Sequence, residues 1–413
     1  MERFKYLKAT PAEAEIRRRI MASGPMTFAD FMSVALYWYD GGYYTTGTAF
    51  GPDGDFYTAP LTHPAFGSLL ARQVEEMWLM AGSPKSWWVV EPGAGLGVLA
   101  ADVVAAVGAK SGGPMDGLLR YLAVDQSRPQ QPIPGVSWAQ SLALPVRGLQ
   151  GVVLANELFD AMPVHRVTME HGVLREVFVG LEESLDSNGT SRFIDVLGSP
   201  SAGVAERLDG LGVTLGEGYR AEVCLLMNDW MTGVGRGMES GYLLLIDYGH
   251  EANAYYNEIR HKGLLRTYYK HTVGTDPYVH VGRQDISVHV ELTSLRDAAV
   301  AAGFEEAGTT TQSEFLRSMG MEEYRAAIAS RSDLPRVVRS ANLTALDTLM
   351  DLDAMGGFNV LVFAKGVPAA GLSGFSGLAP DPSGSVPAAT LGGLAFSGVE
   401  QVVDMPTWED LLT

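Results

Sequence analysis

A glycine-rich turn between two apolar runs constrains this chain more than any other feature. The turn is Glu91–Gly97, EPGAGLG; it follows the run SWWVV and precedes the run VLAADVVAAV. We expect a strand at 87–90 and a helix at 96–107, joined by this turn. A strand, a tight glycine turn and a helix form the first unit of a doubly wound sheet, and such sheets bind ligands at this turn.

The alternation of helix and strand continues on both sides of the turn. We expect a helix at 66–80 and strands at 121–124, near Trp138 and at 151–155. After Pro163 the strands HRVTME and LREVFVGLEE indicate an inserted β-rich subdomain, followed by a helix at 221–231. The sheet pattern resumes with GYLLLIDYGH, and then come a helix at 294–302 and the strands FEEAGTTTQ and FNVLVFAKG. The predicted fold class is α/β, a parallel sheet with helices on both faces.

The chain divides into five predicted segments. They are an N-terminal helix and lid (1–65), the ligand-binding half of the core (66–163), the inserted subdomain (164–220), the second half of the core (221–366) with an insertion at 251–293, and a Gly/Pro/Ser-rich tail with a short acidic end (367–413). Thr27 is a candidate N-cap in the N-terminal helical pattern. The aromatic, glycine-rich stretch after it is either a lid or a packed surface loop. The tail has the composition of a linker, so we expect little packing beyond residue 365.

Charge and cysteine content exclude several kinds of partner. The 413 residues carry a formal net charge of −18 and one cysteine, Cys224. Binding to nucleic acid needs clustered Lys and Arg, so this acidity argues against it and favours a cationic substrate or simple solubility. One cysteine permits no internal disulfide and no Cys-rich metal site, and we predict no metal. We see neither an apolar run of about 20 residues nor a targeting segment, which predicts a cytoplasmic protein without membrane insertion.

The spacing of the glycines distinguishes the ligands that bind at such turns. A P-loop needs GxxxxGK followed by Ser or Thr, which is absent, and a dinucleotide site needs a glycine at the position of Val98. S-adenosylmethionine (SAM) carries no phosphate, and its sulfonium and ammonium are positively charged. Glu91 before the glycines suits such a cation, and Asp125 at the end of the next strand can accept hydrogen bonds from ribose hydroxyls. A tight turn without a ligand is the alternative.

Collinear blocks extend well beyond the turn. They include GPMTFADFM, GGYY, GDFYTAP, EPGAGLG, ANELFDAMPVH, LREVFV, LLIDYGH, DISVHV, FLRSMGM and FNVLVFAKG, over roughly residues 20 to 366. In this order they resemble the MidA family of class I SAM-dependent methyltransferases, which includes a mitochondrial complex I assembly factor that acts as a protein arginine methyltransferase. Leu96 replaces the usual Arg of the loop, and Leu61 stands where a Glu is common. We expect these two replacements to leave the cofactor pocket intact and to affect substrate choice and the contacts around the lid.

The resemblance implies a fold and a cofactor site. The fold is a seven-stranded methyltransferase sheet with its last strand antiparallel and SAM at the carboxyl ends of the strands; S-adenosylhomocysteine is the product. By this resemblance Gly93, Gly95 and Gly97 line the methionine part of SAM, Glu91 lies beneath it and Asp125 contacts the ribose. The other implied cofactor residues are Asn156, after the fourth strand, and a cover over the cofactor formed by Phe56, Thr58 and Pro60.

The block NELFDAMP falls where class I methyltransferases place residues beside the transferred methyl. By this resemblance Asn156 and Glu157 face the substrate. A guanidinium is a weak nucleophile because its charge is delocalised, and a carboxylate such as Glu157 or Asp160 would orient it. His250, at the end of DYGH, could accept a proton. The structural alternatives are a cap of a following helix for Glu157, a turn acid for Asp160 and a satisfied strand-end histidine for His250.

Three functions remain open at this point. The first is SAM-dependent methylation of a protein, on arginine, and the second is methylation of a small molecule. The third is a non-catalytic assembly factor that retains a SAM pocket, motivated by the absent loop Arg and lid Glu. The sequence leaves the oligomeric state open, with a homodimer among the alternatives.

Overall fold

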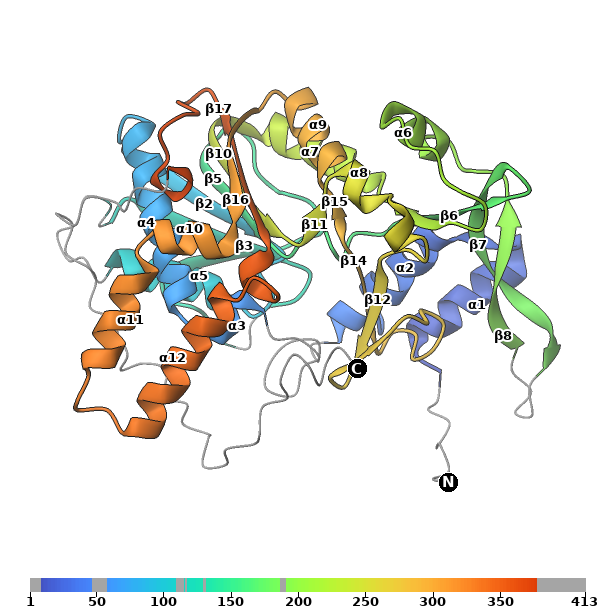
Figure 1. The fold of residues 1–413 in the computed structure, drawn as a ribbon, viewed down its shortest axis with the longest axis horizontal. Helices are drawn as coiled ribbons and strands as arrows, with labels where there is room; N and C mark the ends of the chain where they lie inside the picture. The colour runs from blue at the N-terminus through green and yellow to red at the C-terminus, as the bar shows by residue number, and fades with distance from the viewer. Residues whose placement is uncertain are drawn as a thin grey trace. The chain divides into compact units, whose positions relative to one another are not determined.

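The computed structural model describes residues 9–46, 58–108, 115, 117–128, 131–185 and 191–376 (Figure 1). The chain divides into two compact units. Unit 1 comprises Met1–Phe56, Phe159–Asp229 and Gly249–Leu295. Unit 2 comprises Tyr57–Leu158, Trp230–Tyr248 and Arg296–Thr413. Each unit is therefore assembled from stretches that are far apart in the sequence.

Unit 2 is built on a seven-stranded sheet with the order β16-β17-β10-β5-β2-β3-β4. Its strands are β2 (Trp87–Pro92), β3 (Leu119–Asp125), β4 (Val136–Gln140), β5 (Leu149–Asn156), β10 (Met238–Asp247), β16 (Glu305–Thr311) and β17 (Asn359–Lys365). Neighbouring strands from β4 to β10 run parallel, whereas β17 lies between β10 and β16 and is antiparallel to both. The expected seven-stranded sheet with a reversed last strand is confirmed.

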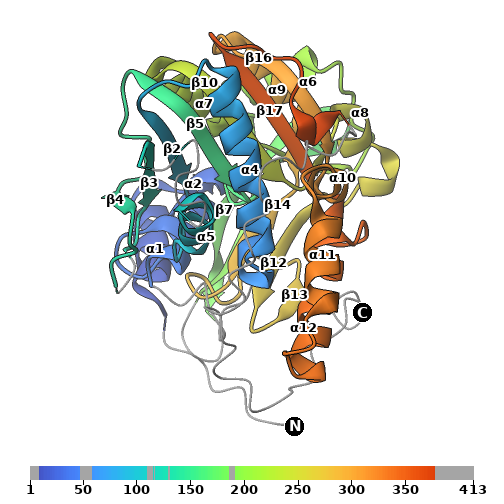
Figure 2. The same cartoon turned by 90° about the vertical axis from the view of Figure 1, so that its left-hand side faces the viewer.

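The central strands are continuous apolar runs because helices cover both faces of a parallel sheet. In β10 no residue of the run 242–246 is more than 1% exposed. Helices α4 (Ala65–Met80) and α5 (Val98–Gly108) share one apolar core with the sheet (Figure 2). The two helices approach closely at Gly67, where an added Cβ would lie 2.5 Å from the Cβ of Asp102.

Unit 2 also contains helices that the sequence analysis does not predict. They are α3 (Ala59–Thr62), α10 (Gln312–Ser318), α11 (Met321–Ser330) and α12 (Arg336–Met350). The last two lie side by side (Figures 1 and 2). In α12 only Leu346 and Leu349 are buried, so its apolar stripe is too thin to stand out in the sequence.

The residues just after β17 pack on unit 2, which corrects the expectation of an unpacked tail from residue 366 onward. The backbone N–H and hydroxyl of Ser373 donate to the Glu76 carboxylate at 2.6–3.1 Å. The Gly374 N–H donates to Gln73 Oε1 at 3.2 Å, and Phe375 lies against Phe315 with ring centroids 5.7 Å apart. The rest of the predicted tail lies outside the described residues.

Unit 1 combines a five-stranded sheet of order β1-β7-β6-β9, with β8 paired to β7, and two small sheets, β13-β12-β14 and β11-β15. The strands are β1 (Met26–Thr27), β6 (His165–Glu170), β7 (Val173–Leu185), β8 (Ser191–Gly198), β9 (Arg220–Val223), β11 (Gly249–His250), β12 (Leu265–Tyr269), β13 (Thr272–Gly274), β14 (Asp285–Val288) and β15 (Val290–Glu291). Its helices are α1 (Pro11–Ser23), α2 (Phe28–Tyr37), α6 (Val204–Gly210) and α8 (Ala252–Tyr255). The division into units falls inside α7 (Leu226–Gly237) and α9 (Leu292–Ala301).

One predicted helix is placed wrongly. The expected helix at 221–231 begins instead at Leu226, because residues 220–223 form β9, which pairs antiparallel with β6. The predicted N-cap Thr27 is confirmed, since its side chain accepts a hydrogen bond from the Asp30 N–H at 3.0 Å. In the described part of the chain, no helix has both the length and the apolar character needed to cross a membrane.

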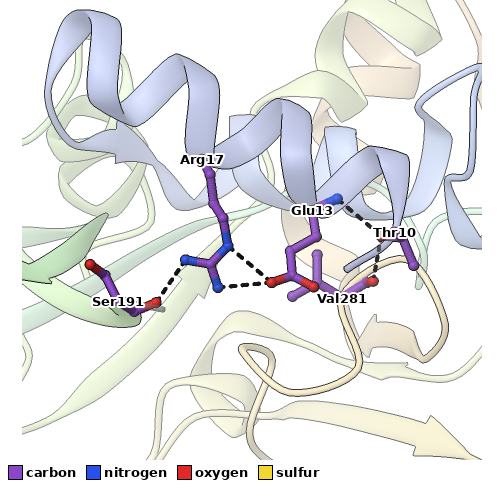
Figure 3. Close-up of polar contacts among 5 residues, drawn as sticks. All are labelled: Thr10, Glu13, Arg17, Ser191 and Val281. Atoms are coloured by element: carbon purple, nitrogen blue, oxygen red, sulfur yellow. Dashed lines mark hydrogen bonds and ion pairs between the residues drawn. The ribbon is translucent and has the colours of Figure 1, made fainter. Parts of the chain in front are cut away.

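Helix α1 is tied into unit 1 by side chains at its start and middle (Figure 3). Thr10 caps the helix by accepting from the Glu13 N–H at 3.0 Å, and its hydroxyl donates to the Val281 carbonyl at 2.9 Å. The Arg17 guanidinium donates hydrogen bonds to the Glu13 carboxylate at 2.8 Å and to the Ser191 carbonyl at 2.7 Å. These contacts connect the N-terminal segment to stretches more than 170 residues away in the chain.

Candidate cofactor site

The turn between β2 and α5 adopts a conformation that requires glycine. Gly93, Gly95 and Gly97 have φ angles of 71°, 54° and 73°, in the left-handed region. An added Cβ at Gly97 would lie 2.4 Å from Ile133 Cδ1 and 3.0 Å from the Trp138 ring. The sequence therefore encodes a compact turn whose backbone can approach a ligand closely.

Glu91 lies beneath this turn at the end of β2. Its side chain is 4% exposed, and the Tyr121 hydroxyl donates to its Oε2 at 2.8 Å. Burial is the main cause that raises the pKa of Glu91 to about 8; the Tyr121 hydrogen bond opposes the shift and the nearby Asp125 adds to it. The predicted acid is therefore present, and its hydrogen-bond partner is a residue that sequence reasoning missed.

Asp125 closes β3 and holds the turn from the other side. Its Oδ2 accepts from the Gly95 N–H at 2.9 Å, and its Oδ1 accepts from the Ser127 N–H and hydroxyl at 2.8 and 2.9 Å. The Trp138 indole N–H donates to the Ser127 carbonyl at 2.8 Å. The carboxylate thus orients the glycine turn, in addition to the ribose contact that the resemblance implies.

The end of β4 lies next to Asp125 and was missed as a site segment. Gln140 pairs with Asp125 in the parallel register, and the Ser141 N–H donates to the Asp125 carbonyl at 2.9 Å. Leu142 follows with 72% of its surface exposed. The sequence could have indicated this segment, because the residues that follow parallel strands all lie at the same edge of the sheet.

Asn156 is the last residue of β5, and Glu157 follows it. The Asn156 Nδ2 donates to Glu157 Oε1 at 3.0 Å, whereas Asn156 Oδ1 is buried and has no hydrogen-bond partner in the described part of the chain. Glu157 has a φ of 47°, a backbone conformation that residues other than glycine rarely adopt. Its N–H donates to the Ile246 carbonyl at 2.8 Å. Residues 158–164 form turns and irregular structure, so Glu157 is not the cap of a following helix.

Asp160 belongs to unit 1 and is 7% exposed. Its carbonyl accepts from the Val288 N–H at 2.8 Å, and its charge helps to raise the pKa of Asp285. Burial is the main cause that raises the pKa of Asp285 to about 7, and the Tyr44 hydroxyl donates to this carboxyl at 2.6 Å. Asp160 is therefore part of a buried acid and tyrosine network within unit 1.

His250 also belongs to unit 1, in β11. Its ring stacks on that of His289 with centroids 5.2 Å apart, and His250 Nε2 lies 3.3 Å from His289 Nδ1. Burial and then Arg260 lower the pKa of His250, and burial is the main cause that lowers the pKa of His289 to about 3. A lowered pKa makes His250 a weaker proton acceptor than an ordinary histidine.

The expected cofactor cover is described only in part. Phe56 lies outside the described residues. Thr58 and Pro60 stand at the start of α3 in unit 2 and are half-buried, and the Thr58 carbonyl accepts from the Thr62 hydroxyl at 3.1 Å. Their contact with a cofactor stays a prediction.

The strand ends of unit 2 fit SAM by their chemistry. Residues 91–97, 125–127, 140–142 and 156–158 contain no Lys or Arg. They offer acceptors instead: the carboxyls of Glu91 and Asp125 and the orphaned Asn156 Oδ1. Acceptors suit an ammonium and ribose hydroxyls, whereas a pyrophosphate would require cations. Among the described residues no group of three or more His, Cys, Asp and Glu could hold a metal ion.

This sheet, with its reversed strand and a glycine turn after the first parallel strand, defines a class I methyltransferase fold that uses SAM. The family model described as "Putative S-adenosyl-L-methionine-dependent methyltransferase" matches residues 69–310, more than half of the chain. The chain therefore belongs to this family of SAM-dependent methyltransferases.

Similar proteins cover most of the chain. The crystal structure of a COG1565 superfamily member from Burkholderia thailandensis, bound to S-adenosyl-homocysteine, is 30% identical with a TM-score of 0.74 and covers 88% of this chain and 94% of that one. "Protein arginine methyltransferase NDUFAF7, mitochondrial" from Mus musculus is 26% identical over 84% of this chain and 83% of its own length. The Drosophila melanogaster homolog is 27% identical over 74% of each chain. SAM is accordingly the cofactor of this enzyme.

Proposed function

We propose that this methyltransferase transfers the methyl group of SAM to an arginine side chain of a protein. Methyl transfer from SAM follows from the family, whereas the acceptor is our inference. The names of the mouse and fly relatives, which match most of the chain, support an arginine acceptor. The observation that best supports the proposal is the Glu157 carboxylate at the end of β5, which Asn156 fixes by a hydrogen bond.

The reaction needs little chemistry from the protein beyond orientation. A guanidinium nitrogen attacks the methyl carbon, the carbon–sulfur bond breaks, S-adenosylhomocysteine leaves, and the nitrogen loses a proton. Because the guanidinium charge is delocalised, a carboxylate that binds it can turn one nitrogen towards the methyl. Glu157 suits this role because the Ile246 carbonyl fixes its backbone and Asn156 fixes its carboxylate.

The backbone of Glu157 adds support for a role in function. A left-handed residue other than glycine costs roughly 1–3 kcal/mol and is often found at functional sites. Asn adopts this conformation more readily than Glu. Selection for stability alone would therefore favour Asn or Gly at position 157.

Labelling with SAM that carries a trideuterated methyl group tests the acceptor. The enzyme is incubated with extract from cells that lack this chain, the protein is hydrolysed, and labelled methylarginine is measured by mass spectrometry. The wild type should produce it. Glu157→Gln should reduce the yield by about 100-fold, the scale typical of losing one preorganised polar group, while calorimetry shows unchanged SAM affinity.

Asp160→Asn serves as the matched variant, because Asp160 is the other acid of the same motif. We expect it to retain most of the methylarginine signal. Loss of signal in Asp160→Asn with retention in Glu157→Gln would contradict the role of Glu157. Label that appears only in small molecules, or in no product, would contradict the arginine acceptor itself.

A further inference from the structure

Four ionisable groups of unit 2 lie together near the glycine turn: Glu91, Tyr121, Asp125 and Asp102. Glu91 faces the small residue Ala123 across the parallel β2–β3 register, and on β3 Tyr121 and Asp125 stand two residues before and after Ala123. This places Glu91 between a tyrosine hydroxyl and a second carboxylate. Asp102 of α5 supplies a third carboxyl on this side, close enough to Tyr121 to raise the pKa of that phenol.

The charges of this cluster are not balanced inside unit 2. No Lys or Arg forms a hydrogen bond or ion pair with Glu91, Asp102 or Tyr121 in the part of the chain that the structure describes. Asp102 Oδ2 is buried there without a hydrogen-bond partner. An ionised carboxylate that is buried without a cation loses its hydration with no compensation, so such a group keeps a proton instead.

Glu91 is the member of the cluster that lies under the turn. Burial raises its pKa to about 8 and that of Asp102 to about 7. At neutral pH Glu91 is therefore mostly protonated while the turn is empty. A positively charged ligand above it would reverse this preference, because an opposite charge nearby favours the ionised carboxylate.

We infer that Glu91 carries a proton in the free enzyme and that SAM binding releases this proton to solvent. The inference rests on the proposed position of the methionine part of SAM above Glu91. Only the O–H bond of the carboxyl breaks: a neutral acid and a cationic ligand become a carboxylate, a bound cation and a free proton. The Tyr121 hydroxyl, 2.8 Å away, stabilises the carboxylate that remains.

The coupling has a definite sign. Because the free enzyme holds the proton, raising the pH towards 8 removes a competitor of SAM and should strengthen binding. Affinity should rise by up to about tenfold per pH unit below this value and level off above it. Asp125, the other charged group that faces Glu91, is fixed by Gly95 and Ser127.

Calorimetric titration with SAM at pH 7 in phosphate, MOPS and Tris buffers counts the proton. Because the buffer takes up each released proton, the binding enthalpy falls as the ionisation enthalpy of the buffer rises, and the size of this negative slope equals the number of protons released. For a group with a pKa of about 8 we expect about 0.9 proton per SAM. Glu91→Gln should bind SAM with no slope and little pH dependence, whereas the matched variant Asp102→Asn should keep the wild-type slope.

Each other result overturns the inference. A wild-type slope of zero, or a slope that persists in Glu91→Gln, would show that Glu91 is not the source, and a slope lost only in Asp102→Asn would assign the proton to Asp102. If Glu91→Gln fails to fold, infrared difference spectra of the wild type must show a protonated carboxyl band that disappears with SAM. Absence of any SAM binding would instead contradict the cofactor itself.

Discussion

Individual residues of the site are held by neighbours that sequence spacing does not reveal. The glycines and Asp125 were predicted from their order along the chain, and the structure places them around one turn. Tyr121 and Trp138 were not predicted as site residues, because their contacts arise from the pairing of parallel strands and from side-chain direction. Spacing finds the residues of a continuous motif, whereas register determines which residues support it.

A substitution at Gly97 tests the turn directly. Gly97→Ala places a methyl group 2.4 Å from Ile133 Cδ1 in a backbone conformation that alanine disfavours. We expect SAM affinity to fall by at least about tenfold, because strain of 1–3 kcal/mol is relieved only by moving the turn. Calorimetry measures this. Gly108→Ala, at the other end of α5 with open space around its Cβ, is the control and should bind normally.

The partly buried His289 makes the free energy of unfolding depend on pH. Its folded pKa of about 3 lies below the unfolded value near 6.5, so the unfolded chain takes up the proton first as the pH falls. Protonation of His289 therefore does not lower the free energy of unfolding above pH 6.5. Below pH 6.5 it should lower the free energy of unfolding by up to about 1.4 kcal/mol per pH unit. Urea unfolding of wild type and His289→Gln at pH 5 to 7 should show a shallower pH dependence in the variant; equal slopes would contradict this assignment.

At the scale of elements, strongly apolar strands were predictable and weakly patterned helices were not. The runs that became β2, β5 and β10 were located to within a few residues, because a strand buried on both faces must be apolar throughout. The helix predicted at 221–231 was placed wrongly because β9 and α7 follow each other in the sequence without a clear boundary between them. Helix α12 escaped because it buries little surface.

The cap of α1 gives a prediction at the same scale. Thr10→Ala removes both the cap on Glu13 and the hydrogen bond to the Val281 carbonyl. We expect a loss of roughly 1–2 kcal/mol in the free energy of unfolding, measured by urea denaturation with circular dichroism. Thr10→Ser retains the hydroxyl and should lose much less. Equal losses in both variants would place the effect in packing of the Thr methyl group.

At the scale of the whole molecule, the sequence predicts unit 2 far better than unit 1. The α/β alternation and the resemblance together predict a seven-stranded sheet with an antiparallel last strand, which the structure confirms. Unit 1 gathers three stretches that the sequence analysis treats as separate segments. Contacts such as Thr10 with Val281 join residues 271 positions apart, and no local pattern encodes such a pairing.

A crystal structure of this chain with S-adenosylhomocysteine would show where the cofactor binds. We expect ligand density at the turn formed by residues 93–97, with the ribose at Asp125 and the amino group near Glu91 and Asn156 Oδ1. Density at another position, or a turn that stays empty at saturating ligand, would contradict the assignment of this turn as the cofactor site.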